Sequence, residues 1–289
     1  MKVLVTGAGG QLGYDVVREL RRRGHEAIGV DIAEMDITDR KSVFSVVRSV
    51  QPDAVIHCAA WTAVDAAEDA ENRDTVYRIN VTGTQNLADA CREAGCRMMY
   101  ISTDYVFDGS GEKPWSPDCK DYAPQSVYGR TKLEGERAVA STLSDYFIVR
   151  IAWVFGVHGK NFVRTMLRLS ETHDSLRVVC DQIGTPTYTY DLARLLVDMI
   201  ETDKYGYYHA TNEGGYISWA DFAAEIFRQA GKATKVIPVT TEEYAISKAK
   251  RPYNSRLDKS KLTENGFARL PDWRDALSRY LRETEDGNE

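Results

Sequence analysis

Tyr128 and Lys132 are the residues of this sequence whose types and spacing point most directly to chemistry. They stand four apart, and residues four apart share one face of a helix. A lysine ammonium beside a phenol favours the phenolate and so lowers the tyrosine pKa from about 10 toward working pH. Such a tyrosine can donate a proton to a carbonyl that is being reduced. We therefore predict that Tyr128 and Lys132 are catalytic.

The same spacing occurs a second time, at Tyr244 and Lys248, so the pattern by itself carries little weight. The surroundings of the two pairs differ. Tyr128 lies on a predicted helix that leads into a strand of a predicted sheet, whereas Tyr244 lies in an irregular segment. We interpret Tyr244 as a packing or surface residue.

Hydroxyl and carboxyl groups follow another predicted strand, at Ser102, Thr103 and Asp104. A hydroxyl at this place can hydrogen-bond a substrate carbonyl oxygen, which makes Thr103 a candidate for the same reaction as Tyr128. By local propensity alone, Ser, Thr and Asp also serve as caps of turns. Both interpretations of this segment therefore stay open on the residues alone.

A run of glycines near the amino terminus predicts a dinucleotide site. Gly7, Gly10 and Gly13 follow a short apolar run and open a predicted helix. Glycines at such a turn let the backbone approach a pyrophosphate, and the helix N-terminus supplies free N–H groups. We predict that these glycines, with Gln11 and Leu12, bind the cofactor. A tight turn without a ligand is the alternative.

Acidic residues follow the second predicted strand. Asp31 can accept hydrogen bonds from the adenosine ribose hydroxyls, and its charge opposes a 2′-phosphate, so it favours NADH. The alternative is a solvated loop acid. Asp36 and Ile37, a little further along, are predicted to border the adenine.

Small residues follow the third predicted strand, at Ala59 and Ala60, with Trp61 and Thr62 next. Two alanines leave room for a cofactor to lie against the backbone. A turn built from small residues is an equal alternative.

These candidates all follow short apolar strands that alternate with amphipathic helices. The predicted strands are 3–6, 26–30, 54–58, 97–102 and 147–151, and the predicted helices are 12–23, 41–50, 77–94 and 127–144. Apolar strands joined by helices form a parallel sheet covered on both faces, and ligands bind beyond the carboxyl ends of its strands. The fold class is therefore α/β, a doubly wound, Rossmann-like parallel sheet.

The second half of the chain is less regular. Residues 191–201 and 218–230 predict helices, and 177–180 and 235–238 predict short strands. We predict a dinucleotide-binding domain over 1–150. Residues 151–289 form a smaller, discontinuous substrate-binding lobe, with some segments that return to the first domain.

Composition narrows the class of partner. The chain has 289 residues, a net charge of −6, 43% hydrophobic residues and five scattered cysteines. These values fit a globular protein in a reducing cytoplasm and predict neither nucleic acid nor membrane as a partner. We find no cluster of ligands that supports a metal site.

Taken together, these motifs resemble the extended short-chain dehydrogenase/reductase family, and within it the dTDP-4-dehydrorhamnose reductase family. The broader resemblance rests on the glycine motif, Asn80, Ser102, Thr103, Tyr128 and Lys132. The closer one rests on residues 11–13, 59–65, 102–107, 153, 161–162, 181–184, 186–187 and 251–257. It runs from residue 1 to about residue 281 and includes both halves of the chain.

The resemblance implies that NADPH or NADH reduces the 4-keto group of a nucleotide sugar, dTDP-4-dehydro-L-rhamnose. It implies that Tyr128 is the proton donor, that Lys132 holds the nicotinamide ribose, and that Thr103 and Asp104 lie at the sugar carbonyl. Trp61 and Thr62, with the two alanines before them, would line the cofactor. Trp153 would stack on the sugar, and Arg256 is the candidate for the diphosphate, which arginine suits. A homodimer is the oligomeric state that we expect to be possible.

Two alternatives stay open. One is a sibling nucleotide-sugar epimerase or 4,6-dehydratase. In dehydratases of this superfamily an acid follows the Thr-Asp pair, whereas Tyr105 stands there in this chain. The other is a cofactor-binding regulatory subunit, as in methionine adenosyltransferase. Fold alone does not decide among these functions.

Overall fold

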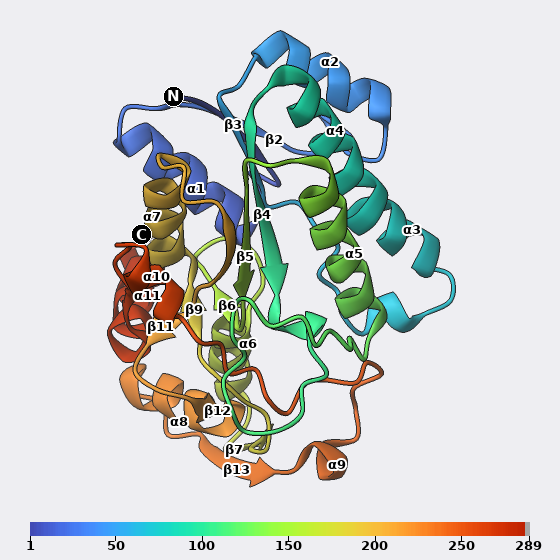
Figure 1. Ribbon diagram of the computed structural model, residues 1–289. Helices are drawn as coiled ribbons and strands as arrows, with labels where there is room; N and C mark the ends of the chain where they lie inside the picture. Colours follow the sequence, from blue (N-terminus) through green and yellow to red (C-terminus); the bar gives the residue numbers. More distant parts are fainter. Residues whose placement is uncertain (287–289) are drawn as a thin grey trace.

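Six parallel strands form the central sheet of this computed structural model, which describes residues 1–286 (Figure 1). Their order is β10-β5-β4-β3-β1-β2. The strands are β1 (Lys2–Thr6), β2 (Glu26–Val30), β3 (Ala54–His57), β4 (Arg97–Thr103), β5 (Tyr146–Ile151) and β10 (Gly206–His209). The order reverses between β1 and β3, and such a switch point opens a crevice at the carboxyl ends of the strands.

Helices cover both faces of this sheet, which confirms the predicted doubly wound α/β class (Figure 1). Side chains alternate along each strand, so Val3 and Val5 pack toward α1 and α7 while Leu4 packs toward α2, α4 and α5. The strands read as continuous apolar runs because neither face meets water. The helices are α1 (Gln11–Arg22), α2 (Arg40–Val50), α4 (Thr84–Ala94), α5 (Val127–Thr142) and α7 (Thr189–Ile200).

The helix predicted over 77–94 is not one continuous α-helix. It consists of the end of α3 (Arg73–Tyr77), a π-helical turn η2 (Arg78–Gly83) and α4. Within this turn the Asn80 side chain accepts a hydrogen bond from the Trp61 N–H at 2.8 Å and donates to Thr131 Oγ1 at 3.0 Å. Periodicity did not reveal this widened turn, because a single π turn hardly disturbs the pattern.

The second half has its own apolar core, formed by α6 (Phe162–Ser170), α8 (Trp219–Gln229) and α11 (Trp273–Asp286). The two predicted strands are present as β7 (Ser175–Val179) and β13 (Lys235–Val239), which pair in parallel. β10 and α7 come from the second half and complete the first sheet and its cover. The domain boundary at residue 150 stays a prediction.

Short ladders in the second half and several short helices complete the fold. Three two-stranded ladders pair β6 (Val154–Phe155) with β9 (Thr187–Tyr188), β8 (Ile183–Gly184) with β12 (Ile217–Ser218), and β11 (Asn212–Glu213) with β14 (Leu270–Asp272). The short helices are η1 (Ala66–Glu68), η3 (Asp104–Val106), α9 (Thr241–Tyr244) and α10 (Ser260–Glu264).

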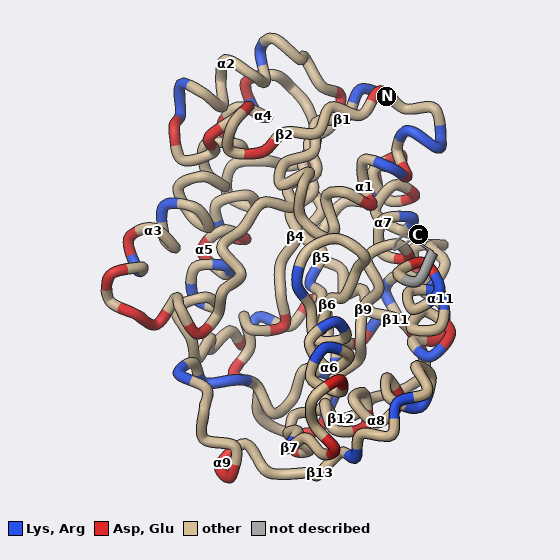
Figure 2. The backbone as a smooth tube through the Cα atoms, turned by 180° about the vertical axis from the view of Figure 1, so that it is seen from behind, with Lys and Arg blue, Asp and Glu red and all other residues tan. Residues whose placement is uncertain are grey.

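Acidic and basic residues are interspersed along the chain rather than separated by sign (Figure 2). Within residues 1–286, no helix combines the length and the apolar character needed to cross a bilayer.

Candidate active site

A cavity of about 840 Å³ lies at the carboxyl ends of the parallel strands, between the sheet and the second half of the chain. This is the edge at which an open α/β sheet binds its ligands. Most of the predicted site residues line it. They are Gly7, Gly10, Gln11, Leu12, Gly13, Asp31, Asp36, Ile37, Ala59, Ala60, Thr62, Thr103, Asp104, Tyr128, Lys132 and Trp153.

The glycine loop is shaped for close backbone approach. Gly7 has a left-handed φ of 67°, and a Cβ built there would lie 2.8 Å from the Ala59 nitrogen. A Cβ on Gly13 would lie 2.1 Å from the Gly7 carbonyl oxygen. Gly10 caps α1 without a side-chain hydrogen bond, so the positive end of this helix is left for an anion. These features fit the pyrophosphate of a dinucleotide.

Asp31 faces this loop. Its Oδ2 accepts a hydrogen bond from the Gly9 N–H at 2.6 Å, and the residue lines the cavity. Next along this wall, Asp36 accepts hydrogen bonds from the N–H and hydroxyl of Thr38, both at 2.8 Å. Arg78, which the sequence analysis did not single out, donates to Thr38 Oγ1 at 3.2 Å and also lines the cavity.

Trp61 does not line the cavity, contrary to its predicted cofactor contact. Its side chain packs against the cluster of Ala67, Val76 and Val127, and its indole N–H donates to the Ala63 carbonyl at 3.1 Å. The Asn80 side chain holds its backbone N–H. The loop after β3 therefore turns its alanines toward the cavity and its one large side chain away from it.

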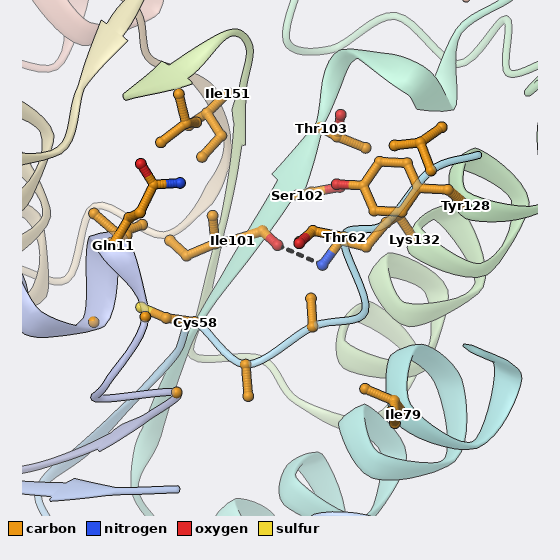
Figure 3. A pocket seen from close by; sticks show the side chains of 18 of the residues that line it. Gln11, Cys58, Thr62, Ile79, Ile101, Ser102, Thr103, Tyr128, Lys132 and Ile151 are labelled. Carbon is orange, nitrogen blue, oxygen red and sulfur yellow. Dashed lines mark hydrogen bonds between the residues drawn. The ribbon is translucent and has the colours of Figure 1, made fainter. Parts of the chain in front are cut away.

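α5 presents the predicted catalytic pair. The Ser126 hydroxyl caps this helix by accepting from the Gly129 N–H at 3.0 Å. Tyr128 directs its hydroxyl toward the end of β4, where Ser102 and Thr103 lie (Figure 3). Lys132 lies one turn further along α5, and its Nζ donates to the Ile101 carbonyl at 2.7 Å.

The predicted lowering of the Tyr128 pKa is wrong. Burial raises the pKa of this phenol, with a hydrogen bond to Thr103 opposing that rise and the Asp104 charge adding to it. Lys132 is tied to a backbone carbonyl, and burial lowers its own pKa to about 7. Desolvation of both groups outweighs the mutual effect that spacing alone suggested. The phenol therefore stays protonated, as a proton donor requires.

A buried ion pair fixes α5 against the central sheet. Arg150 donates to the two carboxylate oxygens of Glu136 at 2.8 and 2.7 Å, and both side chains are buried. Ser102 donates to the same carboxylate at 2.5 Å. Glu136 lies one turn beyond Lys132 and opposes the fall of the lysine pKa. This pair ties α5 to β4 and β5. No sequence motif predicted this ion pair.

Asp104 brings in the second half of the chain. Its carboxyl accepts hydrogen bonds from Thr103 Oγ1 at 3.0 Å and from Ser255 Oγ, and burial raises its pKa to about 6. Arg256, the predicted diphosphate ligand, does not line the cavity. It donates to Asn254 Oδ1 at 3.0 Å instead, and Pro252 and Ser255 are the residues of this segment that line the cavity.

Three basic side chains line the cavity: Arg78, Lys132 and Lys160. Trp219 also lines it and stacks on Trp153. Lys160 and Trp219 could not be predicted from the sequence, because each stands alone in a segment without a recognisable spacing. Among residues 1–286, no group of three or more His, Cys, Asp or Glu side chains is arranged to hold a metal ion.

Comparisons with known proteins extend over nearly the whole chain. A family model described as the RmlD substrate binding domain matches residues 1–285. The spore coat polysaccharide biosynthesis protein SpsK of Bacillus subtilis is 43% identical over 282 residues, which cover 98% of this chain and 97% of that protein.

Solved structures agree with this match. A dTDP-4-dehydrorhamnose reductase from Clostridium acetobutylicum has a TM-score of 0.94 and 44% identity, covering 99% of this chain and 100% of that one. A dTDP-4-dehydrorhamnose reductase from Bacillus anthracis, in complex with NADP, has a TM-score of 0.93 and 41% identity, covering 98% and 100%.

Proposed function

The chain belongs to the RmlD family, and we propose its reaction from this premise and from its similarity to dTDP-4-dehydrorhamnose reductases. It reduces the 4-keto group of dTDP-4-dehydro-L-rhamnose, with NADPH or NADH as reductant, and yields dTDP-L-rhamnose. One observation carries the proposal. A single cavity joins a glycine loop that fits a dinucleotide to the Tyr128 hydroxyl, Thr103 and Lys132.

The bound coenzyme would supply the hydride that reduces the C4 carbonyl carbon. Tyr128 then supplies the proton for the C4 oxygen, since burial keeps its phenol protonated. Thr103, which contacts that phenol, orients it and the substrate oxygen. In its charged form Lys132 has three donors and uses one on the Ile101 carbonyl, so further donors remain for the nicotinamide ribose.

On the substrate side, we assign Asp104 and Trp153 to the binding of the sugar. Asp104 is buried, held by Thr103 and Ser255, and lies beside the proposed proton donor. Trp153 presents an aromatic ring at the wall that the second half contributes. Arg256 is not part of this assignment, because its guanidinium is bonded to Asn254 outside the cavity.

Coenzyme oxidation tests the reaction. NADPH or NADH is mixed with dTDP-4-dehydro-L-rhamnose generated in place, and the loss of reduced-nicotinamide absorbance is followed. We expect oxidation that depends on the sugar. A chain that oxidises neither coenzyme and purifies with tightly held NAD would instead be an epimerase or dehydratase, which regenerates its cofactor. Coenzyme binding without turnover of any sugar would indicate a regulatory subunit.

Asp31 is our candidate for coenzyme choice. One carboxylate oxygen is engaged by the Gly9 N–H, which leaves the other for a ribose hydroxyl. Asp31→Ala should weaken the binding of NADH more than that of NADPH, because only the 2′-phosphate suffers repulsion from this charge. Glu34→Ala is the matched control, since Glu34 caps the Asp31 N–H at 2.9 Å. Equal loss for both coenzymes in Asp31→Ala would contradict the assignment.

We also infer a cytoplasmic location and a homodimer. Five free thiols, two of them adjacent and buried at Cys91 and Cys96, fit a reducing compartment. Light scattering of the purified chain tests the assembly, and a monomer at micromolar concentration would exclude the dimer. Cell fractionation tests the location.

A further inference from the structure

Trp153 is held in an unusual backbone conformation at the cavity wall. Its φ is 53°, in the left-handed region that side chains rarely adopt. It stands between β5, which ends at Ile151, and β6, which begins at Val154. Here the chain leaves the central sheet for the second half. This conformation is costly for a residue with a Cβ, so other contacts must stabilise the orientation of its indole.

The main contact is a face-to-face stack with Trp219. The two ring centroids are 3.7 Å apart and the planes differ by 15°. Trp219 is supported in turn by Phe162, at 4.6 Å between centroids. All three rings come from the second half, and both indoles line the cavity.

Gly184 provides the space in which the Trp153 ring lies. A Cβ on Gly184 would stand 2.8 Å from Trp153 Cε2 and 3.0 Å from Nε1, which is closer than real Cβ contacts. Gly184 pairs with Ile217 in the β8–β12 ladder, and Trp219 follows this ladder directly at the start of α8. One ladder therefore places both the stacking partner and the open space.

We propose that Trp219 is a positioning residue, which together with Gly184 holds Trp153 in one orientation as a preformed wall for the sugar of the nucleotide substrate. The proposal rests on the proposed function, because the ligand of this wall is the nucleotide sugar. Preorganisation lowers the cost of ordering a side chain upon binding, so loss of Trp219 affects substrate binding more than the chemical step.

Steady-state kinetics with two substitutions tests this role. Trp219→Ala should raise the KM for the nucleotide sugar by roughly two- to twelve-fold, the range that corresponds to an aromatic stack. It should leave kcat and the Kd of NADPH within about two-fold, because the stack is made equally in ground and transition states. Trp219→Phe should restore most of the lost affinity.

Trp115→Ala is the matched control, because Trp115 stacks on Phe107 at 4.6 Å but does not line the cavity. An equal rise in KM in this control, an unchanged KM in Trp219→Ala, or a failure of Trp219→Phe to rescue would each overturn the positioning role. Should Trp219→Ala fail to fold, Gly184→Ala is the second test: its Cβ would stand 2.8 Å from Trp153 Cε2, so it should displace the Trp153 ring and raise the KM likewise.

A thermal double-mutant cycle gives a readout that needs no turnover. Trp153→Gly relieves the left-handed strain in either background, but it loses the stack only where Trp219 is present. Its effect on Tm should therefore be more favourable in the Trp219→Ala background than in the wild type. Additive effects would overturn the proposed coupling. If the cycle shows this coupling but the wild-type protein oxidises no coenzyme with the sugar, the proposed function is refuted and, with it, the sugar as ligand of this wall.

Discussion

The chain carries the Tyr-x-x-x-Lys spacing twice, and the two regions differ in helix continuity and in whether they line the cavity. Tyr128 and Lys132 lie on one face of α5 and line the cavity. Tyr244 is the last residue of α9, and Ala245 follows it with a left-handed φ of 49°. The helix ends before it reaches Lys248, so this second pair shares no helical face.

Burial separates the two lysines further. Burial lowers the pKa of Lys132 to about 7, whereas the hydrogen bond that Lys248 donates to Asp69 raises the pKa of Lys248. The ion pair of Lys248 with Asp69 spans 2.8 Å at the surface. The spacing therefore acquires chemical meaning only where a continuous helix and a buried environment accompany it.

Removal of the two hydroxyls should give the largest contrast. Tyr128→Phe should lower kcat by about 10² to 10⁴, the range of a general acid, with coenzyme binding near normal. Tyr244→Phe should leave kcat within about two-fold, because Tyr244 lies outside the cavity. Single-turnover hydride transfer measures both. Turnover of Tyr128→Phe within a few-fold of the wild type would show that another group is the acid.

The ion pairs beneath the two regions should differ in energy. Glu136→Gln leaves Arg150 buried without its countercharge, and loss of one partner of such a pair costs about 3 to 5 kcal/mol. Asp69→Asn removes the partner of the exposed Lys248 and should give no measurable change. Urea unfolding measures both. Pairing Glu136→Gln with Arg150→Met should recover part of the loss, and a cost for Glu136→Gln below about 1 kcal/mol would contradict the assignment.

The two lysines should differ in their effect on stability across pH. The Lys132 pKa falls from 10.5 in the ordinary case to about 7 in the fold. Between these values the unfolded state binds more protons, so the contribution of Lys132 to the free energy of unfolding rises with pH, and its burial cost is full below about 7. Lys132→Met should flatten this slope between about pH 7 and 9, and Lys248→Met should not. Parallel wild-type and Lys132→Met curves would contradict this sign.

The helix caps should show the smallest contrast. Ser126→Ala removes the buried cap of α5 and should cost about 1 kcal/mol. Thr240→Ala removes the capping box of α9, a helix of four residues at the surface, and should cost less because little structure depends on it. Urea unfolding of the two variants measures the difference. A larger loss in Thr240→Ala would show that the second region is more integral to the fold than its exposure indicates.

Much of the fold could be predicted because parallel strands and their helices leave strong local patterns. The apolar strand β1 and the glycines after it define one strand-to-helix turn, and the later strands repeat the pattern. The π turn around Asn80 could not be predicted, since its reason lies in contacts with Trp61 and Thr131 far along the chain. The assignment of Arg256 rests on its residue type and that of Trp61 on the family resemblance, and neither side chain lines the cavity.

By itself the sequence determined which residue types follow which strands, and hence that Tyr128, Thr103 and the glycine loop meet at one edge of a parallel sheet. Periodicity and turn chemistry are local properties, so the sequence displays them directly. Tertiary structure alone decided that burial keeps the Tyr128 phenol protonated, that Trp61 and Arg256 lie outside the cavity, and that Trp219 stacks on Trp153. Desolvation and stacking depend on what surrounds a side chain in three dimensions, and spacing along the chain does not record that.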